Sequence, residues 1–386
     1  MKQVLYALFS FISIATYSQN KFFVKGKIDG IADGEIVNLF RYRDGSIDGA
    51  SADTIRNGNF TLSDTVAKPT LYWILPFGEK FPDYALELWA APGITAEISG
   101  KGYLLKTWKV KSLLREQQEE NQYLAPSVDD WNKVQLLQIQ RKALRQQMQN
   151  ATGKAKDSLD KYRDMLGDRS DSIESAITGK QIELMKKSPV TDIWMNKMIS
   201  LARLVTYKPE TPYRRAIMQL YEKIPTEKRR TAIGEKITNN LFPPTVVKPG
   251  EAMADAPLLD TQLVSHHLGE YANKGRYVLL DFWFMNCGPC VMAMPETKAL
   301  SDSLKNKLTI IGINTDETDY WQTRSKEKQI SWVNLNDSKG RDGLAGYYGA
   351  EGAPHYVLIS PDGIILDAWT GYEEGSLRKK VLQYIH

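Results

Sequence analysis

The two cysteines of this 386-residue chain, Cys287 and Cys290, are three residues apart, a spacing that suits three kinds of chemistry. A structural zinc site needs four ligands, and the four histidines of the chain do not show the spacing of a second ligand pair. A structural disulfide that closes so small a loop restrains the unfolded chain little. We therefore interpret the pair as a redox-active dithiol without a metal.

The residues around the pair, VLLDFWFMNCGPCVMAMP, place it between a strand and a helix. An apolar run that reaches Trp283 predicts a buried strand, and the residues after Cys287 predict a helix. The sulfur of Cys287 would face unpaired N–H groups at the helix start, which favour the thiolate and make Cys287 the nucleophile. Cys290, one turn into the helix, is expected to resolve the mixed disulfide.

Asp281 interrupts the apolar strand six residues before Cys287. A buried carboxylate near a thiol is costly unless it is used. We expect Asp281 to act as general acid and base for Cys290, taking its proton as that thiol attacks the mixed disulfide. The alternative is a satisfied polar residue at the end of a strand.

These residues resemble the active-site strand and helix of thioredoxin: Asp281, then Phe-Trp, then Cys-Gly-Pro-Cys, then Pro295 five residues on. The similarity spans about residues 250–386. The lead-in segment and GAPHYVLISPDG resemble the exported thioredoxin-like oxidoreductases of the TlpA type. The resemblance implies an α/β thioredoxin-like fold at the C-terminus and no cofactor. The Gly-Pro dipeptide resembles the reducing members of the family, which favours reduction of disulfides.

The resemblance also implies how a substrate is bound. Pro354 matches a cis-proline that faces the cysteines, and the backbone of Ala353 would pair with a substrate strand. Trp283 would either contact the substrate or pack beside the active site. The implied partners are client proteins with disulfides and a membrane electron donor that re-reduces the dithiol.

Four positions depart from the family pattern or stand out beside it. Asn286 replaces the usual aromatic residue before the first cysteine and makes that edge more polar. Gly312 stands where thioredoxin has a lysine, so the pKa of Asp281 should be raised mainly by burial. His355 stands where a threonine is common, and it would either titrate near the site or pack. Glu351 would lie at the groove rim or be a solvated loop acid.

Charge and the N-terminal residues indicate the partners and the compartment. A net charge of +4, with basic residues scattered among acids, argues against nucleic acid as a partner. After Lys2, residues 4–15 are apolar, and small residues precede a cut after Ser18. This pattern predicts a cleaved signal peptide over residues 1–18, since a membrane anchor needs about 20 apolar residues. We therefore expect a soluble protein of the bacterial periplasm.

The chain after residue 18 predicts four regions. Residues 19–105 contain short strands separated by DG, NGN and APG turns, which predicts an antiparallel β-sandwich. Residues 106–242 show helical spacing of apolar residues and predict an all-helical region. A Pro-rich linker over residues 243–256 leads to the thioredoxin-like domain, residues 257–386, where we expect the order β-α-β-α-β-β-α.

Together these features predict a periplasmic thiol–disulfide oxidoreductase that reduces client disulfides, and two alternatives stay open. The sandwich and helices resemble an extension of unknown function found ahead of such domains in bacterial envelope proteins. They would recognise a ligand or partner if the protein is an envelope binding protein whose redox domain is secondary. A thiol peroxidase would usually need an arginine near its reactive cysteine, which the sequence does not place.

Overall fold

The computed structural model describes residues 20–43, 46–149, 151–272, 274–328 and 330–385. The predicted signal peptide lies outside the described residues. The chain clusters into two compact units: the N-terminal unit reaches Lys197 and includes Arg215–Lys223, and the C-terminal unit holds the other residues. No helix within the described ranges is long and apolar enough to cross a membrane. The four predicted domain boundaries remain predictions.

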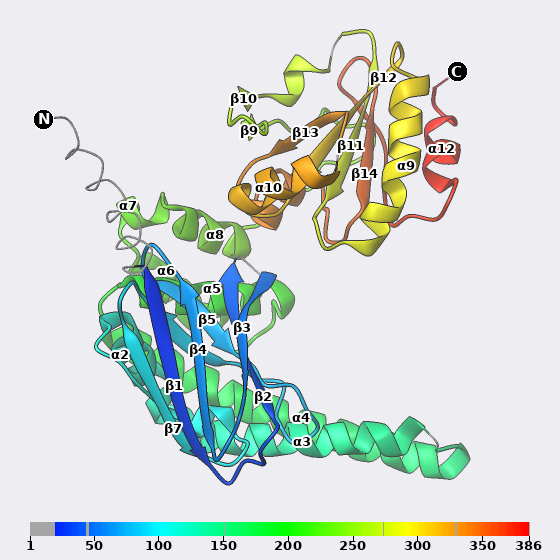
Figure 1. Ribbon diagram of the computed structural model, residues 1–386. Helices are drawn as coiled ribbons and strands as arrows, with labels where there is room; N and C mark the ends of the chain where they lie inside the picture. The colour runs from blue at the N-terminus through cyan, green and yellow to red at the C-terminus, as the bar shows by residue number, and fades with distance from the viewer. Residues whose placement is uncertain (1–19, 44–45, 150, 273, 329, 386) are drawn as a thin grey trace, which may run out of the picture. The chain divides into compact units, whose positions relative to one another are not determined.

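The N-terminal unit begins with two four-stranded sheets packed face to face (Figure 1). Side chains alternate between exposed and buried along β1 (Lys21–Asp29), so Phe22 and Val24 point into the shared core. The ring of Phe22 lies 4.9 Å from that of Tyr72 on the other sheet. The other strands are β2 (Ile36–Arg43), β3 (Ser46–Thr54), β4 (Asn59–Thr65), β5 (Thr70–Ile74), β6 (Leu86–Ala90), β7 (Thr95–Lys101) and β8 (Lys109–Lys111).

One strand pair departs from a purely antiparallel sandwich. The sheet orders are β4-β1-β7-β8 and β3-β2-β5-β6, and β1 runs antiparallel to β4 but parallel to β7, with Phe23 beside Thr95. Parallel neighbours need a long crossover connection, which here passes through the whole second sheet. The pattern within each strand does not reveal this pairing, because the two strands are far apart in the sequence.

The predicted helical region is present, and its longest elements are α3 (Val128–Gln149) and α4 (Gly153–Lys187). These two helices lie side by side (Figure 1). Leu137 and Leu144 of α3 and Leu166 of α4 form a buried cluster. The other helices of this region are α2 (Arg115–Leu124), α5 (Asp192–Tyr207), α6 (Arg214–Glu222), α7 (Thr226–Arg229) and α8 (Ala232–Leu241).

The C-terminal unit contains a seven-stranded sheet of order β10-β9-β13-β12-β11-β14-β15. In it, β11 (Tyr277–Trp283) is parallel to β12 (Leu308–Asn314) and antiparallel to β14 (His355–Ile359). Every residue of β11 after Tyr277 is buried, which explains its apolar sequence. The remaining strands are β9 (Leu258–Leu259), β10 (Ser265–His266), β13 (Val333–Asn336) and β15 (Ile365–Thr370).

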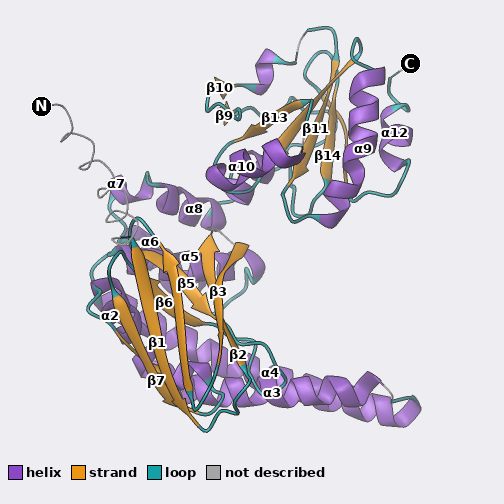
Figure 2. Ribbon diagram, viewed as in Figure 1, coloured by secondary structure: helices purple, strands orange, loops and turns teal. Residues whose placement is uncertain are grey.

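Helices lie against both faces of this sheet (Figure 2). On one face, α9 (Gly288–Ser303) contacts α12 (Ser376–Val381), and their apolar side chains pack on Leu279. On the other face, α11 (Leu344–Tyr347) packs on Phe282 and its neighbours. This is the predicted thioredoxin-like α/β arrangement. The structure adds β13 after α10 (Thr318–Lys328), a strand too short and too rich in asparagine to be predicted.

Alanine substitutions at two helical glycines, one in each unit, test how closely the helices are packed. A Cβ on Gly167 in α4 would meet no described atom within 4 Å besides its own helix backbone, whereas one on Gly234 in α8 would lie 2.0 Å from the carbonyl oxygen of Lys228. We expect Gly167→Ala to raise the free energy of unfolding by about 1 kcal/mol. Gly234→Ala should lower it by about 2 kcal/mol or more. Hydrogen exchange of the amides in each unit measures the change in the free energy of unfolding of that unit. Equal changes in the two variants would contradict the open space at Gly167 and the close contact at Gly234.

Candidate redox active site

The cysteine pair lies where β11 ends and α9 begins. Cys287 is the N-cap residue of α9, and the backbone N–H of Cys290 donates to Sγ of Cys287 at 3.1 Å. Pro289 occupies the first turn, where its missing N–H is harmless. The two sulfurs are joined in a disulfide, so this is the oxidised form of the pair. After reduction, the same N–H would favour negative charge on the Cys287 sulfur.

Apolar side chains enclose the pair on most sides. Cys287 and Cys290 are each 4% exposed and form a buried cluster with Trp283, Met285 and Trp321. Gly288 and Pro289, by contrast, are exposed. The accessible side of the disulfide is therefore the first turn of α9.

A loop distant in the sequence also reaches the pair. The Ala353–Pro354 peptide bond is cis, and the carbonyl oxygen of Ala353 lies 3.4 Å from Sγ of Cys287. The loop comes here because β14, which follows it, pairs with β11. Trp283 is 3% exposed, and this placement favours packing over substrate contact. The substrate-binding roles of Pro354, Ala353 and Trp283 remain predictions.

Asp281 lies within the sheet, beside Gly312 on β12 and Tyr356 on β14. It is 7% exposed, and its Oδ1 has no hydrogen-bond partner among the described residues. Burial raises the pKa of Asp281 to about 7, because the charged form loses its hydration. Side chains alternate along a strand, so Asp281 shares a face with Trp283, which packs on the cysteines. This face therefore carries an acid that can exchange its proton near neutral pH.

The residue beside Asp281 shows why no lysine lies there. A Cβ on Gly312 would lie 3.2 Å from Nε1 of Trp283 and 3.2 Å from Nε1 of Trp332. The two indole rings thus occupy the space that a lysine side chain would need. Burial is accordingly the cause that raises the pKa of Asp281.

Two of the other unusual positions lie apart from the cysteines. His355 is on the sheet face opposite to Asp281: its ring centre lies 6.0 Å from that of Phe282, and its Nδ1 lies 2.7 Å from Oγ1 of Thr370. Burial lowers the pKa of His355, so it is a packing residue. Glu351 is exposed on its loop.

Asn286, at the edge of the site, is connected to the neighbouring helix. It is exposed, and its Oδ1 accepts a hydrogen bond from the hydroxyl of Tyr320 on α10 at 3.5 Å. The guanidinium of Arg324 lies 5.7 Å from the centre of the Tyr320 ring. The polar edge expected from the sequence is therefore part of a contact between the active-site loop and α10.

A polar network lies behind the active-site loop, and the sequence alone did not predict it. Oδ2 of Asp316 accepts hydrogen bonds from the backbone N–H of Met285 at 2.8 Å and from Nδ2 of Asn314 at 3.0 Å. Nδ2 of Asn336 donates to the carbonyl oxygen of Asp316 at 2.8 Å. The network holds the backbone that leads into Cys287. Polar residues at the carboxyl ends of neighbouring parallel strands were the available signal.

The Cys-Gly-Pro-Cys motif lies at the start of α9, directly after the buried strand β11. A motif in this position defines the class of the protein as a thioredoxin-like thiol–disulfide oxidoreductase. Residues 249–368 match the model of the AhpC/TSA family. The chain thus carries an AhpC/TSA-family domain at its C-terminus.

Individual relatives match the same part of the chain. The thioredoxin of Chlorobaculum thiosulfatiphilum is 28% identical over 117 residues, which cover 30% of this chain and 86% of that protein. The thiol-disulfide oxidoreductase ResA of Halalkalibacterium halodurans is 28% identical over 142 residues, which cover 36% of this chain and 79% of ResA. A solved thioredoxin domain of a Bacteroides vulgatus thiol-disulfide oxidoreductase is 25% identical, with a TM-score of 0.33. The match covers 36% of this chain and 99% of the solved chain.

Asp281→Asn tests the burial of the carboxyl group. The pKa of Asp281 rises on folding from 3.8 to about 7, so the folded chain binds this proton more tightly than the unfolded chain. The stabilising contribution of neutral Asp281 is therefore lost as the pH rises from about 4 through about 7, and asparagine does not titrate. Relative to wild type, the variant should gain about 4 kcal/mol in free energy of unfolding over this range. Denaturant titration measures it, and parallel pH curves would contradict the burial of Asp281.

Asp316→Ala tests the network behind the loop. The change removes the acceptor of the Met285 N–H and of the Asn314 amide, so we expect the free energy of unfolding to fall by about 2 kcal/mol. The rate of disulfide reduction should fall as well, because the backbone before Cys287 loses its anchor. The control is Asp302→Ala, which removes a carboxylate paired with exposed Lys298 and should cost less than about 1 kcal/mol. Equal losses in the two variants would contradict the anchoring role.

Proposed function

We propose that this protein is an exported thiol–disulfide oxidoreductase that reduces disulfides in client proteins. The observation that carries the proposal is the placement of Cys287 at the N-cap of α9, with the Cys290 N–H on its sulfur. The buried acid Asp281 and the relatives described as thioredoxin and thiol-disulfide oxidoreductase support the same chemistry. The predicted signal peptide would deliver the protein to the periplasm.

The first step is attack of the Cys287 thiolate on a client disulfide. A bond forms between Cys287 and one client sulfur, and the client disulfide breaks. The second client sulfur leaves as a thiolate and takes up a proton from solvent. A mixed disulfide between enzyme and client results.

The second step is resolution by Cys290. Its thiol gives its proton to Asp281 as its sulfur attacks Sγ of Cys287. The Cys287–Cys290 disulfide forms, and the remaining client sulfur leaves as a thiolate. The client has gained two electrons, and the enzyme has reached the oxidised form present in the structure. A membrane electron donor would return two electrons to the pair.

Cys290→Ala variants in cells test this proposal. The variant retains the nucleophile Cys287 but cannot resolve the mixed disulfide, so clients should remain covalently attached and be released by a reductant. Cys287→Ala is the matched control, and it should capture at least tenfold less, since it lacks the attacking sulfur. Mass spectrometry identifies the clients and the linked cysteines.

The same preparation separates the alternatives. Failure of the wild-type protein to reduce any disulfide, with no capture by Cys290→Ala, would favour a binding protein whose N-terminal unit recognises a ligand. Rapid consumption of hydroperoxide without disulfide reduction would favour a thiol peroxidase. A reduction potential of the Cys287–Cys290 pair of about −120 mV, rather than about −270 mV, would contradict the proposed direction of electron flow.

A further inference from the structure

A groove lies within the N-terminal unit, between α2 and the segment that joins α4 to α5. Its volume is about 320 Å³, and α2 lines it with Arg115, Gln118, Glu119, Gln122 and Tyr123. The facing wall comes from side chains between residues 184 and 191. Pockets for small ligands begin at about 300 Å³. The proposed redox chemistry uses none of these residues, so they are available for another role.

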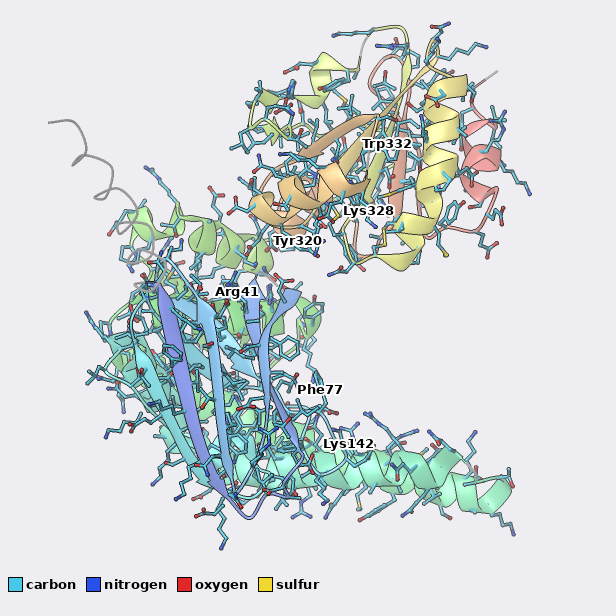
Figure 3. The ribbon with its side chains drawn as sticks, in the orientation of Figure 1. Arg41, Phe77, Lys142, Tyr320, Lys328 and Trp332 are labelled. Carbon is cyan, nitrogen blue, oxygen red and sulfur yellow. A yellow bond between two sulfur atoms is a disulfide. The ribbon has the colours of Figure 1, made fainter. Side chains whose placement is uncertain are left out.

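The end of the groove at Arg115 carries a free positive charge. Arg115 is exposed, and its guanidinium has no hydrogen-bond or ion-pair partner in the described ranges. By contrast, Lys142 of α3, labelled in Figure 3, pairs with Asp83 and donates to the carbonyl oxygen of Phe81 at 2.9 Å. Arg115 is the first residue of α2, and the N-cap residue Leu114 has no side chain that caps this turn. The unpaired N–H groups and the positive helix end therefore act with the guanidinium, and together they suit a carboxylate.

A free negative charge lies one helical turn further along the groove. Oε1 of Glu119 accepts a hydrogen bond from the hydroxyl of Thr191 on the facing wall, which leaves Oε2 for a ligand cation. Four residues of helix separate Arg115 from Glu119, a rise of about 6 Å. Two residues of extended peptide span about 7 Å. The two charges are therefore spaced like the two termini of a dipeptide.

Tyr123 adds an unused donor at the next turn. It is 8% exposed, and its Oη has no hydrogen-bond partner among the described residues. The hydroxyl of Ser188 lies close to it but donates to the carbonyl oxygen of Leu184 at 2.9 Å. Burial raises the pKa of Tyr123, so its hydroxyl stays protonated and can donate. A buried donor without a partner costs free energy, which an acceptor on a ligand would restore.

We propose that the groove along α2 binds a free dipeptide. Its carboxylate pairs with the guanidinium of Arg115, and its amino group pairs with Oε2 of Glu119. The side chain of its first residue extends towards Tyr123, whose O–H favours an acceptor there. This inference goes beyond the proposed redox function and does not depend on it, because no cysteine takes part.

Calorimetric titration of the whole protein tests the carboxylate contact. Alanyl-alanine should bind with a dissociation constant below about 1 mM, and its C-terminal amide at least about tenfold more weakly. Arg115→Gln should weaken binding of the free dipeptide by a similar factor and should bind the amide as the wild type does. Arg145→Gln is the matched control, since Arg145 is an exposed arginine of α3 outside the groove, and it should change neither affinity.

The other two contacts have their own probes. N-acetylation of alanyl-alanine should weaken its binding to the wild type, and Glu119→Gln should abolish this discrimination. Asparaginyl-alanine should bind about fivefold more tightly than alanyl-alanine, and Tyr123→Phe should remove the difference.

Three results would overturn the inference: no binding of either dipeptide, equal binding of alanyl-alanine and its amide by the wild type, or binding of the disaccharide cellobiose in their place. The comparison with the amide needs only the wild-type protein, so it decides even if a variant does not fold. Wild-type protein that binds the dipeptide but reduces no disulfide would refute the proposed redox function alone.

Discussion

The proposed redox chemistry depends on one hydrogen bond between β11 and α9, which the backbone N–H of Cys290 donates to the sulfur of Cys287. It exists because a fully buried strand, β11, ends directly before a helix whose first turn begins at Gly288. A sulfur at a helix N-cap receives N–H groups that have no partner within the helix. The polar network around Asp316 keeps the connecting loop in the geometry that makes this hydrogen bond.

The second constraint is the acid behind the pair. A carboxyl group in a buried strand must stay protonated or find donors when it ionises. In this sheet the residue beside Asp281 is Gly312, and the indole rings of Trp283 and Trp332 fill the space above it. The position beside Asp281 on β12 therefore carries no charged side chain, and the pKa of about 7 follows from burial.

The N-terminal unit is held together by separate interactions. Its sandwich has a core of its own, and two buried charges outside that core are paired with half-buried ones, Lys106 with Glu87 and Glu120 with Lys197. Pairing is what allows such charges to be buried at all. The proposed chemistry needs none of these residues, so the role of this unit is a separate question from the redox reaction.

Local sequence patterns determined the class of the C-terminal domain, the cysteine pair at a helix start and the acid in the strand before it. These features follow from short segments, in which the order of apolar residues, cysteines and prolines dictates strand, turn and helix. The parallel pairing of β1 with β7, the contact of Ala353 with Cys287 and the two tryptophans over Gly312 were decided only by the tertiary structure. Each joins segments that are distant in the sequence, and such contacts depend on strand register and on which side chains fill a space, which no local pattern encodes.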